Sequence, residues 1–225
     1  MLSFSVVTLF PQMIVSHFSE GIIGQALKKG LFNLETKNPR DHALGVHKTV
    51  DDRPFGGGDG MVMLAETLSA TIEEIKKSNP DTHVIYLTPH GKPWSAVEAK
   101  LLSEKKHVTL ISGRYGGIDQ RFINKYVDQE FSIGDYVLSG GEIAALVVID
   151  STARFIEGAL GNNSSAASDS FSLNGLEAPL FTRPEVWDDV GIPEILKSGH
   201  HQNISLWKNQ MGELITLIKR PDLAA

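Results

Sequence analysis

The loop at residues 132–142 has the residue types of a ligand site formed by backbone groups. Gly134, Gly140 and Gly141 allow the main chain to approach a ligand closely and to adopt positive φ values. Tyr136 and Leu138 provide flat apolar walls suited to a ring of purine size. A tight turn before a helix is the simpler alternative. Two similar turns elsewhere in the chain favour the ligand site.

These two turns lie at residues 87–91 and 112–119. Each follows an apolar run that predicts a buried strand, at residues 83–87 and 107–111, and residues 95–106 between them have helical spacing. Ligands of open α/β sheets bind beyond the carboxyl ends of parallel strands, so we expect the three loops to meet at one crevice. Neither the dinucleotide pattern GxGxxG nor the P-loop pattern GxxxxGKS/T occurs, which argues against nicotinamide or nucleoside-triphosphate sites.

The composition is that of an ordinary globular protein, with 41% hydrophobic and 21% charged residues among 225. The absence of cysteine excludes disulfides and zinc–thiolate sites and fits a reducing compartment. The first residues lack the features of a signal peptide, so a cytoplasmic location is expected. A formal net charge of −6 gives no general attraction to phosphates. Composition alone therefore does not predict nucleic-acid binding.

The chain is expected to form two domains joined by a flexible linker. The first, residues 1–160, is an α/β domain that ends in an apolar helix at about 142–160, which carries too many charges to span a membrane. Residues 161–175 begin with a small, polar stretch typical of a linker. The second domain, residues 176–225, has helical signals at 193–197 and 204–218.

Four further features, taken with the three loops, resemble one known family. They are the stretch DDRPFGGGDGM at residues 51–61, Arg154, Asp169 and the stretch SGHH at 198–201. In this order they resemble bacterial tRNA (guanine-N(1))-methyltransferase, of the SPOUT class, from Leu2 to about Leu223. The resemblance implies an α/β SPOUT fold with a deep C-terminal trefoil knot, a small helical C-terminal domain and a homodimer with shared active sites. Periodicity and composition do not indicate a knot, and threaded chains are rare.

The resemblance implies transfer of a methyl group from S-adenosyl-L-methionine to nitrogen 1 of guanosine at tRNA position 37. The partner is the anticodon stem-loop with guanosine at positions 36 and 37. Asp169 matches the general base that removes the N1 proton, and Arg154 matches the cation that stabilises charge on the guanine oxygen. From the sequence without the resemblance, the simpler interpretation is that Asp169 is a solvated linker residue. Arg154 would then form a surface ion pair with Asp150 on the same helix.

The resemblance also assigns binding residues and a metal requirement. The donor-binding residues are Leu87, Thr88, Pro89, Gly91, Gly113, Tyr115, Ile133, Gly134, Tyr136, Leu138, Gly140 and Gly141. The RNA-binding residues are Asp51, Gly60, Arg53, Lys48, Ser198, His200 and His201. A carboxylate such as that of Asp51 can accept hydrogen bonds from guanine's amino and imino groups. Transfer is expected to require magnesium, but no carboxylate spacing identifies an ion site, so no metal ligands are assigned.

Three positions depart from the family pattern. Gly116 stands where the family usually has glutamate, His90 where it usually has glutamine, and Asp59 where proline is common. The missing carboxylate at position 116 leaves a second hypothesis open, a weakly active or inactive protein that binds the donor and RNA. A third hypothesis is a SPOUT methyltransferase with another RNA target.

Overall fold

The computed structural model describes residues 1–160, 170–171 and 175–224. The chain divides into two compact units, Met1–Gly161 and Asn162–Ala225. Most of the predicted linker at 161–175 lies outside the described residues.

The first unit contains a sheet of five parallel strands, ordered β2-β1-β6-β5-β7. Its strands are β1 (Ser3–Val7), β2 (Asn33–Lys37), β5 (His83–Pro93), β6 (His107–Ser112) and β7 (Gln129–Ser132). All six residues of the central strand β6 are buried, as parallel strands covered on both faces require. Because all five strands run in the same direction, their following loops meet at one edge of the sheet.

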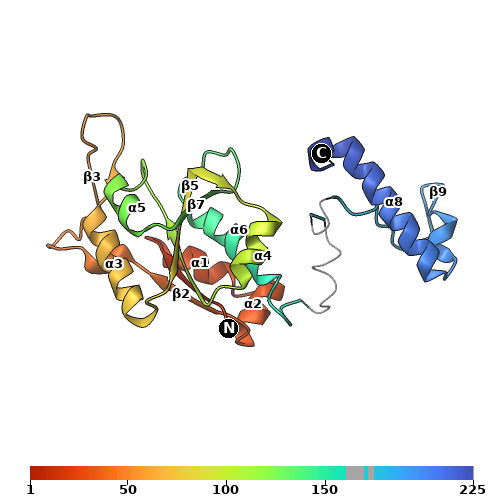
Figure 1. Cartoon of the computed structure of the whole chain (residues 1–225), viewed down its shortest axis with the longest axis horizontal. Helices are drawn as coiled ribbons and strands as arrows, with labels where there is room; N and C mark the ends of the chain where they lie inside the picture. The colour runs from red at the N-terminus through yellow and green to blue at the C-terminus, as the bar shows by residue number, and fades with distance from the viewer. Residues whose placement is uncertain (161–169, 172–174, 225) are drawn as a thin grey trace. The chain divides into compact units, whose positions relative to one another are not determined.

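Helices cover both faces of this sheet (Figure 1). On one side lie α1 (Pro11–His17), α2 (Gly21–Lys28), α4 (Ala96–Ser103) and α6 (Glu142–Ala153), and on the other lie α3 (Ala65–Ser78) and α5 (Gln120–Tyr126). Successive residues of β1 enter opposite cores, because side chains alternate along a strand. Phe4 and Val6 pack in the first core, and Val7 packs with Leu68 and Phe122 in the second.

Three short elements connect β2 to α3. They are the 3₁₀ helix η1 (Pro39–His42) and the strands β3 (Asp51–Asp52) and β4 (Val62–Met63). The two strands pair antiparallel and are joined by the glycine-rich stretch 53–61.

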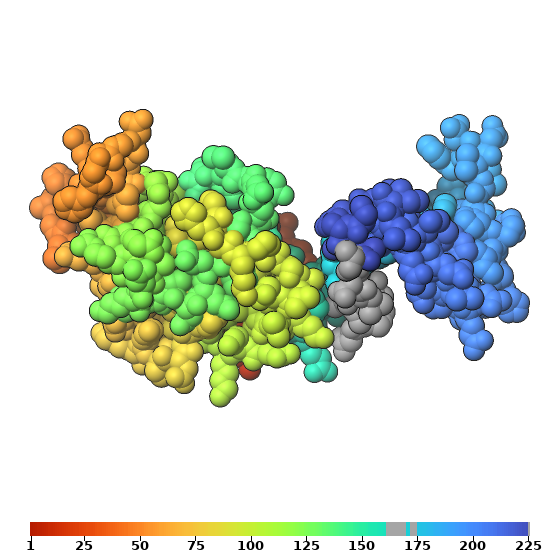
Figure 2. Space-filling view, turned by 45° about the horizontal axis from the view of Figure 1, so that its top comes forward, coloured from red at the N-terminus to blue at the C-terminus, as the bar shows by residue number. Residues whose placement is uncertain are grey.

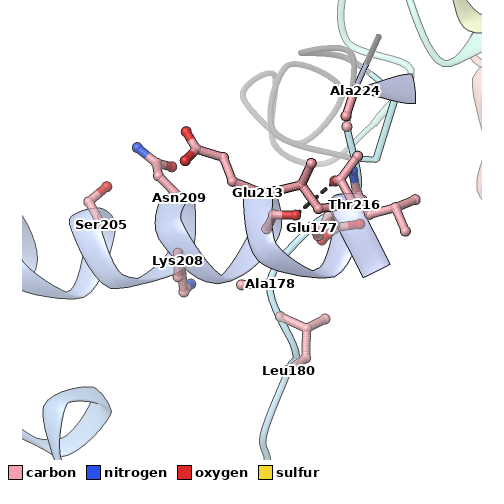
Figure 3. A pocket seen from close by; sticks show the side chains of 13 residues that line it. Glu177, Ala178, Leu180, Ser205, Lys208, Asn209, Glu213, Thr216 and Ala224 are labelled. Carbon is pink, nitrogen blue, oxygen red and sulfur yellow. Dashed lines mark hydrogen bonds between the residues drawn. The ribbon is translucent and has the colours of Figure 1, made fainter. Parts of the chain in front are cut away.

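The second unit is built around α8 (His201–Lys219). It also contains a hairpin of β8 (Val186–Trp187) and β9 (Val190–Gly191) and the 3₁₀ helices η2 (Glu194–Lys197) and η3 (Pro221–Leu223). An extended segment crosses α8, where the Leu176 N–H donates to Thr216 Oγ1 at 2.8 Å. A cavity of about 780 Å³ lies between this segment and α8 (Figure 3).

Two expectations from the sequence need correction. The helix expected at 142–160 ends at Ala153, because the N–H groups of Phe155 and Ile156 bond three residues back and Gly158 takes a φ of +79°. The expected loop at 87–91 lies within β5, whose pairing with β7 stops at Leu87 and resumes at Lys92. Among the described helices, none is long and apolar enough to cross a membrane.

A buried polar chain crosses the sheet near the amino ends of its strands. His107 Nδ1 lies 2.6 Å from Thr82 Oγ1, and its Nε2 lies 3.2 Å from Ser5 Oγ. Since Ser5 donates to Glu35 at 2.5 Å, its oxygen is free to accept from His107 Nε2. The network therefore places a proton on Nε2 of His107. Burial lowers the pKa of His107, and Glu35 only partly opposes that shift.

The free energy of unfolding should therefore depend on the protonation of His107. Because burial lowers the pKa of His107 in the folded state, its contribution to stability is complete above the unfolded value of about 6.5 and is lost at lower pH. Urea unfolding between about pH 7.5 and about pH 5 should show a shallower pH dependence for His107→Asn than for wild type. The exposed His47→Asn is the control and should keep the wild-type slope. An unchanged slope in His107→Asn would show that this histidine does not control the transition.

Candidate active site

A cavity of about 390 Å³ lies at the carboxyl ends of β5, β6 and β7, within the size range of small-molecule sites. The three loops predicted from the glycine pattern provide most of its lining. In Figure 2 the corresponding segments, yellow near residue 90 and two shades of green near 115 and 135, lie together on the surface of the first unit. The larger cavity on α8 contains none of the residues singled out by the sequence.

Eleven of the twelve expected donor-binding residues line this cavity. They are Leu87, Thr88, Pro89, Gly113, Tyr115, Ile133, Gly134, Tyr136, Leu138, Gly140 and Gly141. Gly91 is the exception. A Cβ at Gly91 would clash with the backbone nitrogen of Phe131, so this glycine allows two chain segments to pass closely. Its role in the structure is packing within β5 and β7.

Two glycines that line the cavity also have a packing role. Gly141 N–H donates to the Gly113 carbonyl at 2.9 Å, and a Cβ at Gly141 would lie 2.7 Å from Ser112 Cα. A Cβ at Gly140 would clash with the Arg114 side chain. The loop before α6 therefore lies directly against the loop after β6, and larger residues would separate them.

Tyr86 is a cavity residue that sequence reasoning missed. It lies in the apolar run of β5, where its neighbours predict a core position, and only 6% of its surface is exposed. Burial raises the pKa of its phenol, opposed by hydrogen bonds with Thr88 and the Ile118 backbone. A Cβ at Gly113 would lie 3.0 Å from the Tyr86 ring, so the two residues together shape the cavity floor.

A buried ion pair fixes the cavity's rim. Arg114 Nη2 lies 2.9 Å from Glu142 Oε2, and the Glu142 side chain is only 1% exposed. Glu142 Oε1 accepts from Thr8 Oγ1 at 2.7 Å, just beyond the end of β1. Arg114 Nη1 donates to the Ser139 carbonyl at 3.0 Å, and its guanidinium lies 4.3 Å from the centre of the Phe10 ring. Arg114 and Glu142 together thus join the loop after β6, the loop before α6, α6 itself and Thr8.

Two carboxylates next to the cavity lining in sequence, those of Glu142 and Asp119, are engaged in contacts within the protein. Glu142 is buried and engaged with Arg114 and Thr8. Asp119 accepts from Arg121 Nε at 2.9 Å and Nη2 at 2.6 Å, and these bonds lower its pKa. Asp119 also accepts from the Arg121 N–H at the start of α5. Both side chains therefore have structural roles.

Of the two expected catalytic residues the structure describes only Arg154, which is not among the residues that line the cavity. Arg154 follows α6 directly, whereas Gly141 and Ala144 line the cavity at the helix's other end. At 1.5 Å per residue, about 20 Å of helix separates Gly141 from Arg154. Asp169 lies outside the described residues.

The expected RNA-binding loop is joined to the cavity's rim. Asp51 pairs with Met63 in the β3–β4 ladder, and Gly60 and Arg53 lie in the connecting stretch. The Gly116 N–H donates to the Met61 carbonyl at 2.8 Å, and the Met63 N–H donates to the Gly117 carbonyl at 3.0 Å. These bonds hold the base of the loop against a cavity-lining segment.

The remaining expected RNA-binding residues occupy two other places. The Lys48 carbonyl accepts from Arg40 Nη1 at 3.0 Å, which joins Lys48 to η1. In the second unit, Ser198 follows η2, His200 precedes α8, and His201 is the first residue of α8. No cluster of three or more metal-binding side chains occurs within residues 1–160, 170–171 and 175–224.

Comparisons with known proteins identify the family. The sequence profile described as "tRNA (Guanine-1)-methyltransferase TrmD" matches residues 2–225. The chain belongs to this family. Its relatives include the tRNA (guanine-N(1)-)-methyltransferase of Pseudoalteromonas translucida, 48% identical over 97% of this chain and 86% of the relative. The enzyme of the same name from Vibrio atlanticus is 45% identical over 97% of this chain and 89% of the relative. That from Syntrophomonas wolfei is 46% identical over 97% of this chain and 88% of the relative.

Family membership confirms the resemblance found in the sequence and makes the chain a tRNA guanine-N1 methyltransferase. Such an enzyme requires a methyl donor, which the family implies is S-adenosylmethionine. The five-stranded parallel sheet agrees with the α/β architecture expected for the first domain.

Removal of the charge on Glu142 should destabilise the protein strongly. Glu142→Gln leaves the Arg114 guanidinium, whose side chain is 15% exposed, without its counter-ion. Loss of one partner of a fully buried pair costs about 3 to 5 kcal/mol in the free energy of unfolding, so the loss here should approach the lower end of that range. Urea unfolding measures this loss. Glu98→Gln is the matched control, because Glu98 also lies in the first turn of a helix but pairs with Lys92 in a more exposed place. It should cost less than about 1 kcal/mol. Equal losses in both variants would contradict the role given to the buried pair.

Proposed function

We propose that this enzyme transfers the methyl group of S-adenosylmethionine to nitrogen 1 of guanosine at tRNA position 37. Nitrogen 1 loses its proton to Asp169 and forms a bond to the methyl carbon, while the bond between that carbon and sulfur breaks. The products are N1-methylguanosine and S-adenosylhomocysteine. The observation that carries this proposal is the cavity formed by three glycine-rich loops in a chain of this family.

The cavity's chemistry suits the donor. Its backbone groups are close to the ligand space because glycines line it, and they can form hydrogen bonds to an adenine edge. Ile133, Tyr136 and Leu138 offer apolar and aromatic surface for the ring. No aspartate or glutamate is among the lining residues that the structure describes. The carboxylate of the methyl donor therefore meets no like charge from the cavity's lining.

The proposed roles of Asp169 and Arg154 follow from the charge changes in the reaction. An aspartate with a pKa near about 3.9 is ionised at neutral pH and accepts the N1 proton only if the guanine anion is stabilised. As the proton leaves, negative charge develops on the guanine's exocyclic oxygen. A guanidinium donates hydrogen bonds to that oxygen, which is the role assigned to Arg154.

The distance between Arg154 and the cavity supports a homodimer with shared sites. Arg154 of a second chain could reach the cavity, whereas Arg154 of the same chain lies at the far end of α6. The surface of α6 also supports this arrangement. The helix is apolar on most sides, and its apolar residues Ile143 and Val147 remain 44% and 40% exposed in the single chain. Phe10 and Met13, beside and within the neighbouring α1, are exposed too. An apolar patch of this kind is typical of a surface that a partner covers. The trefoil knot is part of the same proposal.

The proposed RNA partner is the anticodon stem-loop with guanosine at positions 36 and 37, in the cytoplasm. The β3–β4 loop, with Asp51 and Gly60, contacts the target base, and Lys48 and Arg53 provide positive charge close by in sequence. Ser198, His200 and His201 contribute from the second unit. A requirement for magnesium is kept as part of the proposal, but we assign it no residues.

The position of Gly116 gives a specific reason to test activity directly. Glu142 and Asp119 are both engaged, so neither replaces the carboxylate that the family pattern usually has at position 116. A weakly active or inactive protein that binds donor and RNA is therefore the second candidate. A target in another RNA is the third.

Methyl transfer should require guanosine at position 37 of the tRNA. Two transcripts are compared with labelled S-adenosylmethionine, one with guanosines at 36 and 37 and one with adenosine at 37. Label is expected only in the first. Asp169→Ala and Arg154→Ala should each abolish transfer while leaving donor affinity, measured by calorimetry, largely unchanged. Wild-type turnover in either variant would contradict the roles assigned. No label in either transcript, with donor binding intact, would favour the second or third candidate.

A further inference from the structure

The donor cavity, the space of about 390 Å³ at the carboxyl ends of β5, β6 and β7, has two lining side chains that can carry a positive charge. One is Arg114, whose Nη2 lies 2.9 Å from Glu142 and whose side chain is only 15% exposed. The other is His90, which is exposed and whose ring has no hydrogen bond or ion pair with the described residues. Of the two, only His90 can offer a bound anion a positive charge that is not already neutralised.

The backbone on both sides of His90 is held in place. The pairing of β5 with β7 is interrupted here, so the His90 backbone lies outside the ladder. Its N–H donates to Thr88 Oγ1 at 3.4 Å. On the other side, Gly91 packs so closely against the backbone of Phe131 that a Cβ would clash. The histidine therefore lines the cavity from a segment that is fixed at both ends.

The methyl donor brings an anion to this cavity. S-adenosylmethionine carries one carboxylate in its amino-acid part, next to an ammonium group. A carboxylate that loses its water needs hydrogen-bond donors or a cation in return. Arg114 is already engaged, since its two terminal nitrogens contact Glu142 and the Ser139 carbonyl. An exposed histidine at the cavity suits the charged end of the ligand, because that end stays close to water.

We propose that His90, in its protonated form, binds the carboxylate of the methyl donor. This inference rests on the proposed function, which places S-adenosylmethionine in the cavity. Both nitrogens of a protonated histidine ring are donors, so one N–H bonds to the carboxylate while the opposite charges attract. Glutamine, the usual residue of the family pattern here, donates a hydrogen bond but carries no charge. The substitution therefore makes donor affinity in this chain depend on pH.

The other ionisable groups around His90 should not produce this pH dependence. They are lysine, arginine, carboxylate and phenol groups, which do not ordinarily titrate between about pH 6 and about pH 8. They include Lys92 on β5, Glu98 on α4, Glu130 on β7, Arg114 after β6, Asp119 before α5 and Asp135 before α6, together with the tyrosines of the lining. Histidine does titrate in this range, and His90 is the only histidine among the lining residues that the structure describes.

Affinity for S-adenosylhomocysteine tests the proposal, because this ligand keeps the donor's carboxylate and allows no transfer. It is measured by calorimetry at about pH 6 and about pH 8. Wild type should bind about threefold more tightly at the lower pH, as expected for an exposed ion pair with a protonated ring. His90→Gln should bind equally at both. His90→Lys should bind at the higher pH about as tightly as wild type does at the lower, because lysine keeps its charge.

Two controls separate a contact with the carboxylate from a general effect of pH. His47→Gln removes an exposed histidine that is not part of the lining and should keep the wild-type pH dependence. Decarboxylated S-adenosylhomocysteine, which keeps the ammonium group, should not bind wild type more tightly at the lower pH. The proposal is overturned by equal wild-type affinity for S-adenosylhomocysteine at both pH values or by a pH dependence that survives in His90→Gln. Tighter binding of the decarboxylated ligand at the lower pH would also overturn it.

This binding experiment and the methylation assay can fail separately. If His90→Gln removes the pH dependence of binding but the guanosine transcript gains no label, the proposed function is wrong and the role of His90 stands. If the guanosine transcript is labelled and wild type binds S-adenosylhomocysteine equally at both pH values, the role of His90 is wrong and the proposed function stands.

Discussion

The buried ion pair between Arg114 and Glu142 is the interaction on which the site depends. Glu142 begins α6 and also accepts from Thr8 beyond β1, while Arg114 holds the carbonyl of Ser139 in the loop before α6. A buried charge without its partner is costly, so these segments are held together or destabilised together. Because the same loops line the cavity, the ion pair couples the stability of the first unit to the shape of its ligand site.

Close backbone approach is the second constraint, and it explains why glycines are frequent here. Gly91 and Gly141 stand where a Cβ would meet the backbone of another segment. The glycines of the β3–β4 loop have a different purpose, since open space surrounds them and their φ values are positive. Similar sequence patterns therefore serve two physical needs, close packing of segments at the cavity and positive φ values in the exposed β3–β4 loop.

These differences explain what the sequence could and could not predict. The strands and the meeting of their three loops follow from local patterns, because apolar runs followed by glycines are visible within a few residues. The Arg114–Glu142 pair joins residues far apart in sequence, and Tyr86 lies among apolar neighbours, so no local signal identifies either. The predicted helix extends past the end of α6, because residues 154–160 continue the apolar pattern. In the structure, Gly158 and the hydrogen bonds from Phe155 and Ile156 to carbonyls three residues back end the helix. The resemblance to the family was confirmed, whereas the knot, the dimer and the roles of Asp169 and Arg154 stay predictions.

The central claim is that the donor cavity of one chain works with Arg154 of another. It is tested most directly with purified heterodimers that combine a donor-site variant, Gly113→Val, with Arg154→Ala. Gly113→Val fills the space against the Tyr86 ring, and each homodimer alone should be inactive. If the sites are shared, one of the two in the heterodimer has both parts intact, and methyl transfer should recover to about half of wild type. Activity no higher than that of the two homodimers would show that each chain works alone and would contradict the account.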